Sequence, residues 1–444
     1  MNGFLHYFLS MLDPMSNLGF SRAVAELMSS GLPRWWLLAV LPFTLMVLPA
    51  IVVWLVHLVK PAWTHPPLTV RPGQAGPLVS VVIAGRNESA TIGQCIRGAL
   101  LCGYSNLEVI FVDDNSDDNS VAVARRAALS VTRNRRDAER VRIFPSPRRN
   151  GKASSLNIGI RMARGEFIAI TDADSVIQYG TVQHWLLPFA DPRVGGVAAN
   201  IRVHNSTVNL LTRLQEIEYA LKFTTTRFTQ SRLNILNIIS GMGGLFRAEI
   251  LHRLGGFDTG LGDDTDLTTM LRKQRWKLAF SLDAVVWTTV PVTRYHLWRQ
   301  RARWRRNVIK IRVSKHRDQF MLGRYGFANG LLALQVLLVQ LLIPLTILTA
   351  LFWGVFENGP LAVPEIVGTF YWILLIYIVI KVLITRDIAG TPKAVNLWLV
   401  FLYPLYIFFL VGLPQSYAVA SELFRIGAKH PYVPDHVWEE IPWW

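Results

Sequence analysis

The sequence predicts an α/β domain placed between membrane-spanning helices, about one before the domain and about three after it. Of the 444 residues, 51% are hydrophobic and only 17% are charged, and the mean hydropathy is +0.29. This composition is unusual for a soluble protein. Apolar runs of about 20 residues, the length that crosses about 30 Å of hydrocarbon, stand near both ends of the chain. Between them, short β-branched runs alternate with helical stretches, which is typical of an α/β domain.

The chain is expected to begin with a lead-in, a span and a linker. Residues 1–34 lack the basic start and the cleavage site of a secretory signal and predict an N-terminal lead-in. The apolar run 35–59, which lies between Arg34 and Lys60, predicts a spanning helix. Residues 60–77 are rich in Pro and Gly, which interrupt helices, and predict a linker.

The α/β domain is expected over residues 78–290, where no apolar run reaches spanning length. Its strands are predicted at four β-branched runs, Val79–Ala84, Leu107–Val112, Phe167–Thr171 and Gly196–Val203. Strands that alternate with helices imply βαβ units and a largely parallel sheet. The basic segment 125–152 has the composition of a solvated insertion.

The membrane half is expected after the domain. Residues 291–326 carry eleven Lys and Arg against a single acid, Asp318, and predict basic interfacial helices on the cytoplasmic side. Residues 327–424 predict three spans, at about 327–356, 367–385 and 397–424. The tail, residues 425–444, is expected to lie on the membrane surface through its Trp and Tyr residues.

The net charge of +16 arises from 46 Lys and Arg against 30 Asp and Glu. A nucleic-acid partner is not expected, because the basic residues adjoin the spans and no nucleic-acid motif accompanies them. Anchoring to anionic lipid headgroups is the plainer explanation. The two cysteines, Cys95 and Cys102, lack the spacing of a zinc site or a disulfide framework and are expected to be small buried hydrophobes.

Two of the predicted strands end in pairs of carboxylates. Asp113 and Asp114 follow one strand, and Asp172 and Asp174 follow another. In open α/β sheets, ligands bind outside the carboxyl ends of the strands. Two Asp residues at positions i and i+2 are costly to hold close unless a cation neutralises them, and their oxygens suit Mg²⁺ or Mn²⁺ bridging a diphosphate. The alternative for each pair is a helix N-cap.

Two further turns carry polar residues at the start of helices. Asn150-Gly151-Lys152 suits a phosphate, although a surface lysine is the more usual explanation for such a turn alone. Residues 262–266, Gly-Asp-Asp-Thr-Asp, place three carboxylates before a helix that starts near Leu267. One of them could serve as the general base for an alcohol, and the others could cap the helix.

Gln300, Arg303 and Trp304 stand at positions i, i+3 and i+4, so on a helix all three share one face. Arg offers charge and Trp offers a flat apolar plate, which together suit a sugar diphosphate and a pyranose ring. Simple interfacial anchoring is the alternative, because Trp gathers at membrane surfaces.

Taken together and in this order, these residues resemble the family 2 processive membrane glycosyltransferases, the group of cellulose, hyaluronan, chitin-oligosaccharide and poly-N-acetylglucosamine synthases. The resemblance covers about residues 78–307 and rests on seven elements: VSVVIAGRNES, VDDNS, NGKASSLNIGI, the DAD of 172–174, SGMGGLFRAEIL, GGFDTGLGDDTDL and QRARW. Three positions depart from the pattern, because Ala84 replaces the usual Pro, Asp263 the usual Glu and Asn307 the usual Gly.

The resemblance implies a GT-A fold, a UDP-linked sugar donor and an Mg or Mn cation, with roles for individual residues. The residues implied at the nucleotide sugar are Glu88, Asp113, Asp114, Lys152 and Asp172. Those implied at the metal are Asp172 and Asp174. Asp264 matches the catalytic base. The residues implied at the diphosphate and the acceptor are Gln300, Arg303, Trp304, Ser240 and Gly241.

The expected function is that of an inverting, metal-dependent hexosyltransferase in the plasma (inner) membrane, with its catalytic domain in the cytoplasm. It would polymerise sugar into a β-linked polysaccharide and help to export it. Transfer of one sugar to a lipid acceptor is the alternative, because fold and motif do not fix the acceptor. A catalytically inactive membrane subunit is a third possibility. Four spans are few for a wide pore, so a narrow channel, a homo-oligomer or an export partner would be needed.

Overall fold

The computed structural model describes residues 48, 50–56, 58, 76–131, 139–259, 263–321, 324–327, 329–330, 332–333, 343–389 and 397–423. The chain divides into two compact units. The first comprises residues 1–48 and 336–377, and the second comprises residues 49–335 and 378–444. The predicted lead-in and tail, with most of the linker and of the span 35–59, lie outside the described residues.

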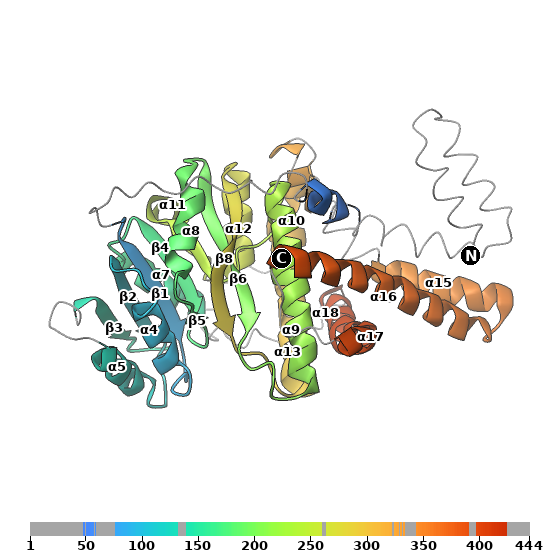
Figure 1. Cartoon of the computed structure of the whole chain (residues 1–444), viewed down its shortest axis with the longest axis horizontal. Coiled ribbons are helices and arrows are strands. Elements are labelled where there is room, and N and C mark those ends of the chain that lie inside the picture. The colour runs from blue at the N-terminus through green and yellow to red at the C-terminus, as the bar shows by residue number, and fades with distance from the viewer. Residues whose placement is uncertain are drawn as a thin grey trace. The chain divides into compact units, whose positions relative to one another are not determined.

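The second unit contains an eight-stranded sheet in the order β3-β2-β1-β4-β7-β6-β8-β5 (Figure 1). The strands are β1 Val79–Gly85, β2 Leu107–Asp113, β3 Val141–Pro145, β4 Phe167–Asp172, β5 Val176–Ile177, β6 Val194–Val203, β7 Gly244–Arg247 and β8 Lys277–Thr288. The pairs β3-β2, β2-β1, β1-β4 and β6-β8 are parallel. Strand β7 runs antiparallel to both β4 and β6, and β5 runs antiparallel to β8. The sheet is therefore mixed, with two strands reversed against the parallel arrangement expected.

Helices cover both faces of this sheet, which explains why its central strands read as continuous apolar runs. One face packs against α4 (Ile92–Leu100), α5 (Ser120–Val131) and α8 (Thr181–Leu186). The other packs against α7 (Lys152–Met162), α11 (Ala248–Leu254) and α12 (Asp263–Lys273). A short 3₁₀ turn, η1 (Leu187–Ala190), follows α8. Cys95 and Cys102 are buried and unbridged, as expected.

The prediction of a solvated insertion over residues 125–152 is wrong at both ends. Its first residues complete α5, and Val141–Pro145 forms the edge strand β3, which pairs with β2. Arg142 pairs with Ile110 in the β2–β3 register, and its guanidinium lies 2.8 Å from the buried Glu108 carboxylate of β2. The basic composition of this segment therefore did not indicate a strand, although the charge of Arg142 is neutralised there by Glu108 of the neighbouring strand β2.

Two helical stretches between residues 210 and 320 contain π-helical turns, which are rare and often mark functional sites. In the first, α9 (Leu210–Tyr219) leads into the π-helix η2 (Ala220–Thr226) and then α10 (Arg227–Arg232). In the second, α13 (Arg294–Ile309) leads into the π-helix η3 (Lys310–Lys315) and is followed by the 3₁₀ turn η4 (Arg317–Phe320). Asn209 begins α9 with a reciprocal capping box to Thr212. The basic stretch after the domain is thus helical over residues 294–315 and 317–320.

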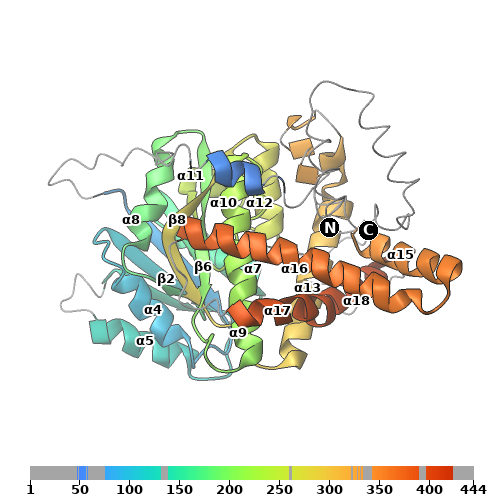
Figure 2. The same cartoon turned by 45° about the vertical axis from the view of Figure 1, so that its right-hand side comes forward.

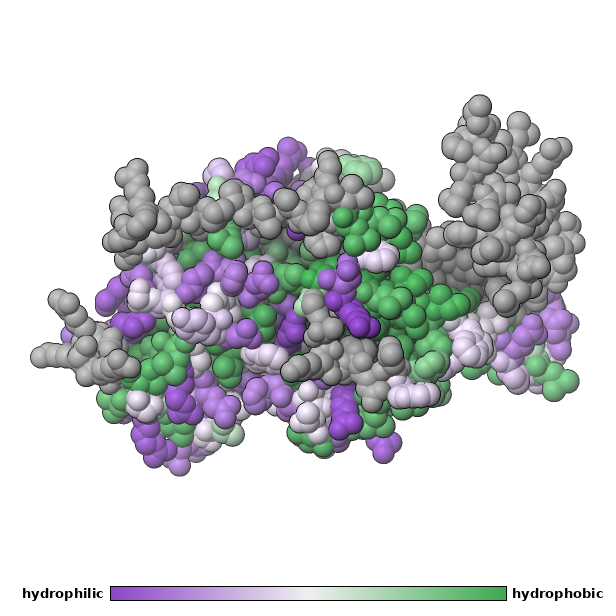
Figure 3. All heavy atoms as spheres, viewed as in Figure 1, coloured by the Kyte–Doolittle hydropathy of each residue, from purple (hydrophilic) through white to green (hydrophobic). Residues whose placement is uncertain are grey.

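Within the described part of the chain, two segments are long and apolar enough to cross a membrane: α16 (Ala362–Ala389) and residues 398–422, with mean hydropathies of 2.3 and 1.7. The second is built from α17 (Leu397–Leu405), the π-helix η6 (Tyr406–Gly412) and α18 (Leu413–Leu423). Figure 3 shows apolar side chains gathered along α16. Within the second unit, α18 packs along α13 (Figure 2). The remaining predicted span is described only as α15 (Ile343–Asn358), and residues 50–56 are helical in the span predicted before the domain.

Candidate active site

Lys152 and Asp172 meet at the carboxyl edge of the sheet. Asp172 ends β4, and Lys152 opens α7 after the turn that contains Gly151. Lys152 Nζ lies 2.5 Å from Asp172 Oδ1, and the two side chains are 32% and 25% exposed. Gly151 has φ of 88°, a conformation that a glycine adopts without strain. The structure thus brings together two residues that the sequence placed at the donor, in a position that solvent reaches.

Three carboxylates, those of Asp172, Asp174 and Glu88, interact electrostatically with Lys152. Burial, together with the negative charges of Asp172 and Glu88, raises the pKa of Asp174 to about 7, and Lys152 offsets this only in part. The pKa of Glu88 is also raised, mainly by burial. The site therefore carries more negative charge than one lysine neutralises, which suits a divalent cation.

The protein ligands for such a cation are few. Among the described residues, no group of three or more His, Cys, Asp or Glu side chains has a metal-binding arrangement. Asp172 and Asp174 could hold Mg²⁺ or Mn²⁺ only with other oxygens completing the coordination. Diphosphate oxygens of a bound substrate fit that requirement.

Asp113 and Asp114 are both buried, and each accepts hydrogen bonds from neighbouring turns. Asp113 accepts from the backbone N and from Oγ of Ser116, at 3.0 and 2.5 Å. Asp114 accepts from the backbone N of Asn150 at 2.7 Å, from the backbone N of Gly151 at 3.0 Å and from Ser155 Oγ at 3.1 Å. Asp114 therefore caps the start of α7 and not the start of α5, the helix that follows Asp114 in the sequence. It thereby holds the turn that leads into Lys152.

Asp264 lies in the first turn of α12 and faces a glycine-rich turn. Its Oδ1 accepts from Thr265 N at 2.8 Å, and its Oδ2 lies 3.4 Å from the donating N of Gly241. The turn closes through Gly243 N, which donates to the carbonyl of the buried Ser240 at 3.0 Å. The structure thus brings Asp264 together with the turn that contains Ser240 and Gly241.

The same turn reaches the end of β4. Thr171 Oγ1 donates to the carbonyl of Met242 at 3.1 Å, and Thr171 directly precedes Asp172. A short chain of contacts therefore joins Asp264 to the aspartates at 172 and 174.

The other carboxylates near Asp264 do not share its position. Asp266 is fully buried and lies 2.8 Å from Lys315 Nζ and 2.7 Å from His316 Nε2. The side chain of Asp263 lies outside the described residues. Among the described members of this cluster, Asp264 is the carboxylate next to the glycine turn.

The QRARW helix contributes a residue that the sequence reasoning missed. Arg301 is fully buried, pairs with Glu218 Oε2 at 2.6 Å and donates to Gln300 Oε1 at 2.6 Å. Its guanidinium carbon lies 4.5 Å from the ring centroid of Trp304, one turn further along α13. Arg303 lies on the same helix. Arg301 thus holds both Gln300 and Trp304.

Glu218 and Lys222 complete this cluster from α9 and η2. Burial alone would raise the pKa of Glu218, but Arg301 and Lys222 hold it below its ordinary value. Lys222 Nζ lies 4.9 Å from the ring centroid of Trp304. Although Lys222 reaches solvent, the protein around its ammonium lowers its pKa to about 8, an effect that Glu218 partly offsets. The spacing of Glu218 and Lys222, at i and i+4, was the one local signal for this pair.

Tyr219 connects the two halves of the site. Its hydroxyl is buried, which raises its pKa. Asp174 and Asp172 raise this pKa further, and Arg301 lowers it. Tyr219 therefore lies within electrostatic reach of both the carboxylate pair and the QRARW helix.

Comparison with known proteins gives three results. A family model described as "Glycosyltransferase like family 2" matches residues 76–307. A poly-beta-1,6-N-acetyl-D-glucosamine synthase of Staphylococcus epidermidis is 30% identical over 228 residues, which are 51% of this chain and 53% of that protein. The synthase of Staphylococcus aureus strain COL is 29% identical over 229 residues, with the same two coverages. The chain thus spans about half the length of the curated relatives it matches.

A solved structure resembles the fold. It is a mannosyltransferase from Pyrobaculum calidifontis in complex with GDP-Man and Mn²⁺, with a TM-score of 0.59 and 21% identity. The match covers 88% of this chain and 99% of that chain. At this identity the likeness shows a GT-A-like α/β fold.

Proposed function

Because the chain belongs to the glycosyltransferase-like family 2, we propose that it is an inverting hexosyltransferase that polymerises sugar from a UDP-sugar into a β-linked polysaccharide. The family match confirms the resemblance seen in the seven motifs. The observation that carries the proposal is the convergence of Asp172, Lys152 and Asp264 at the carboxyl edge of one sheet, linked through the turn at residues 240–243. The relatives, which are poly-beta-1,6-N-acetyl-D-glucosamine synthases, support a polysaccharide product.

In the proposed mechanism, Asp264 accepts the proton of the acceptor hydroxyl while that oxygen attacks the anomeric carbon. The bond to the diphosphate breaks on the opposite side, so the configuration inverts, and an α-linked donor gives a β-linked product. Lys152 and Arg303 stabilise the leaving diphosphate by charge. Trp304 supplies the flat surface on which the acceptor sugar rests.

Asp172 and Asp174 would hold Mg²⁺ or Mn²⁺, which supplies further positive charge against the diphosphate. The excess of carboxylates around Lys152 supports this assignment. The Mn²⁺ bound with GDP-Man in the mannosyltransferase of similar fold is a second support. Glu88 and Asp113, near the same edge of the sheet, are proposed to contact the nucleotide, and Asp114 to act through the turn that it caps.

We place the catalytic domain, about residues 78–290, on the cytoplasmic side of the plasma (inner) membrane. The support is the excess of Lys and Arg over residues 291–326, which favours the cytoplasmic side. The helices α16 and α17–α18 are proposed to hold the enzyme in the bilayer. Export of the polymer, through this chain alone, a homo-oligomer or a partner, belongs to the same proposal.

The test is an incubation of the full-length protein in lipid nanodiscs with Mn²⁺ or Mg²⁺ and a panel of radiolabelled UDP-sugars. Products are resolved by size, and Asp264→Asn is run beside Asp283→Asn, a carboxylate exposed on β8. A ladder from one sugar that Asp264→Asn alone abolishes would support the proposal. A single lipid-soluble product would favour the alternative, transfer to a lipid acceptor. Undiminished activity of Asp264→Asn would refute the assigned base.

A further inference from the structure

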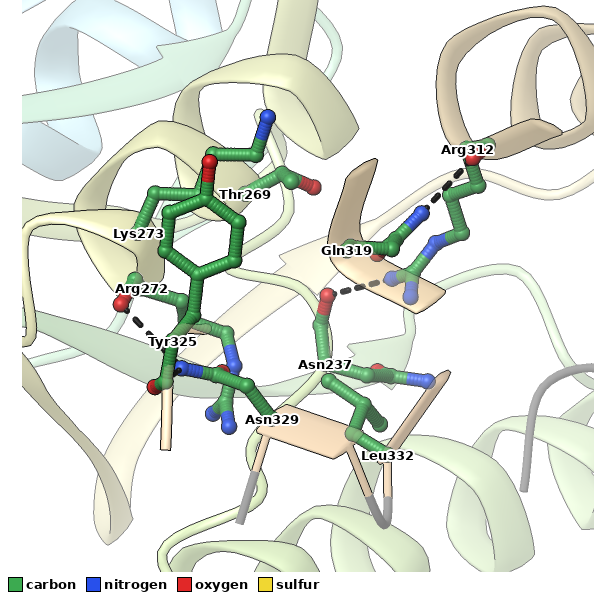
Figure 4. Close-up of a pocket in the computed structure, with 9 residues that line it drawn as sticks. All are labelled: Asn237, Thr269, Arg272, Lys273, Arg312, Gln319, Tyr325, Asn329 and Leu332. Atoms are coloured by element: carbon green, nitrogen blue, oxygen red, sulfur yellow. Dashed lines mark hydrogen bonds between the residues drawn. The ribbon is translucent and has the colours of Figure 1, made fainter. Parts of the chain in front are cut away.

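A second polar pocket lies in the same unit and contains none of the residues assigned to the active site. It is a small pocket that is partly open to solvent. Figure 4 shows the nine side chains that line it: Asn237, Thr269, Arg272, Lys273, Arg312, Gln319, Tyr325, Asn329 and Leu332. Three of these are basic and none is acidic. The pocket is therefore suited to an anion.

Two of the basic side chains are buried. Arg272 and Arg312 are 7% and 3% exposed, and neither takes part in an ion pair within the described part of the chain. Their terminal nitrogens donate to backbone carbonyls, from Arg272 to Leu236 at 3.0 Å and from Arg312 to Asn237 at 2.7 Å. The Nε atom of each is buried and has no hydrogen-bond partner. Each guanidinium thus has one N–H donor that no described protein group uses.

The charges of this pair are costly to bury. Burial and, to a smaller extent, the positive charge of Arg312 together lower the pKa of Arg272 to about 10. Burial likewise lowers the pKa of Arg312 to about 10, which Asp264 offsets only in part. Lys273, in contrast, is neutralised by Asp318 at 2.6 Å. A bound anion would offset the repulsion between the positive charges of Arg272 and Arg312.

The chemistry and position of the pocket indicate the kind of anion. Guanidinium groups form charged hydrogen bonds to phosphate oxygens, and neutral donors such as Asn and Tyr complete such sites. Tyr325, Asn329 and Leu332 belong to the segment where the sequence predicts the chain to enter the membrane. A phosphate at this level could come from a lipid headgroup or from solution.

We propose that Arg272 and Arg312 form a binding site for the phosphate group of an anionic ligand. The site joins α12, the helix that carries Asp264, to the π-helix η3, which continues the QRARW helix. A bound phosphate would therefore connect α12 to η3, two elements next to the active site, without contacting the substrate. The proposal concerns binding and does not depend on the reaction that the enzyme catalyses.

The test measures thermal stability of the full-length protein in a phosphate-free maltoside detergent. One arm adds inorganic phosphate at constant ionic strength against chloride, and the other adds phosphatidylglycerol. We expect a rise in Tm of about 2 °C or more in one arm. The rise should be lost in Arg312→Gln and kept in Arg253→Gln, an exposed arginine on α11. A rise with phosphate identifies a soluble ligand, and a rise with the lipid alone identifies a headgroup.

A second variant covers the case in which Arg312→Gln does not fold. Arg312→Lys keeps the charge but lacks the Nε–H donor of the guanidinium, so it should bind radiolabelled phosphate or lipid about tenfold more weakly than the unmodified protein. No rise in either arm, or an equal rise in the unmodified protein and in the Arg312 variants, would overturn the proposal. Loss of glycosyl transfer would leave these binding results unaffected, so the two proposals fail separately.

Discussion

Arg301 and Glu218 form an ion pair of 2.6 Å in which the side chains are only 0% and 6% exposed. The hydroxyl of Tyr406, from the apolar segment 398–422, donates to the same Glu218 oxygen at 2.5 Å. One carboxylate therefore joins α9, the QRARW helix and a candidate membrane segment. A buried pair contributes little net stability, but removal of one partner leaves the other charge uncompensated.

Glu218→Gln should therefore lower the free energy of unfolding by about 3 kcal/mol. The amide cannot neutralise the buried Arg301 guanidinium. Denaturant titration of the detergent-solubilised protein measures the change. Glu249→Gln, an exposed glutamate on α11, should change it by less than about 0.5 kcal/mol. Equal effects of the two substitutions would contradict the structural role of Glu218.

Because of Lys222, the stability of the folded protein should change with pH in the alkaline range. Its pKa in the folded protein is about 8, below the value of about 10.4 for an unfolded chain. Between these values the unfolded state binds more protons, so stability rises as the pH increases. The unmodified protein should gain stability from pH 7.5 to 9.5 relative to Lys222→Met, as measured by Tm at each pH. Parallel curves for the two proteins would show that the pKa of Lys222 is not lowered.

Lys152→Met should weaken donor binding about tenfold or more. The substitution removes a cation that faces Asp172 and, in the proposed mechanism, the diphosphate; charged hydrogen bonds contribute about 1.5–3 kcal/mol. Titration with UDP measures the dissociation constant. Lys277→Met, which removes a surface pair with Asp191 at 3.3 Å, is the matched control and should leave it unchanged. Unchanged UDP affinity in Lys152→Met would remove this residue from the donor site.

Asp114→Asn should loosen the start of α7. One carboxylate oxygen becomes an amide donor that faces the N–H groups of residues 150 and 151, at a cost of about 1–3 kcal/mol. Hydrogen exchange of the amides of Asn150 and Gly151 should accelerate. Exchange in β3, at the edge of the sheet, should stay the same. Unaltered exchange at both amides would show that Asp114 does not hold the turn.

Mn²⁺ binding should depend on UDP. Asp172 and Asp174 offer too few ligands by themselves, so the affinity for Mn²⁺, followed by electron paramagnetic resonance, should rise when UDP is added. Asp174→Asn should abolish that rise, and Asp283→Asn should preserve it. A cation that binds equally well without UDP would indicate a site different from the one proposed.

The strands that the sequence predicted are the buried ones. β1, β2, β4 and β6 are continuous apolar runs, which is the pattern of strands covered on both faces. The edge strand β3 has only five residues, which are partly or fully exposed and follow a basic stretch, and β7 has only four residues in a glycine-rich stretch. Neither carries a local signal of that kind. The reversal of β7 depends on its neighbours in space, which no local pattern specifies.

In the active site too, the residues with a local sequence signal were predicted and those without one were missed. Asp172, Lys152 and Asp264 were recognisable because each lies in a short motif, and the structure places them along one edge of the sheet and its adjoining turn. Arg301 was hidden in a basic run that resembles a headgroup anchor. Its partner, Glu218, stands 83 residues away, so only the folded chain reveals the pair.

The π-helix η2 determines the direction in which the side chains of η2 and the following helix α10 point. Lys222 faces Trp304, Thr224 Oγ1 donates to Asn200 at 2.7 Å, and Thr226 accepts from Lys381 at 2.7 Å. Loss of one residue within the bulge would restore the ordinary α-helical spacing, but it would turn everything beyond it by about 100°. These partners could not then all be kept. The segment should accept a change of residue more readily than a change of length, the reverse of what a surface loop tolerates.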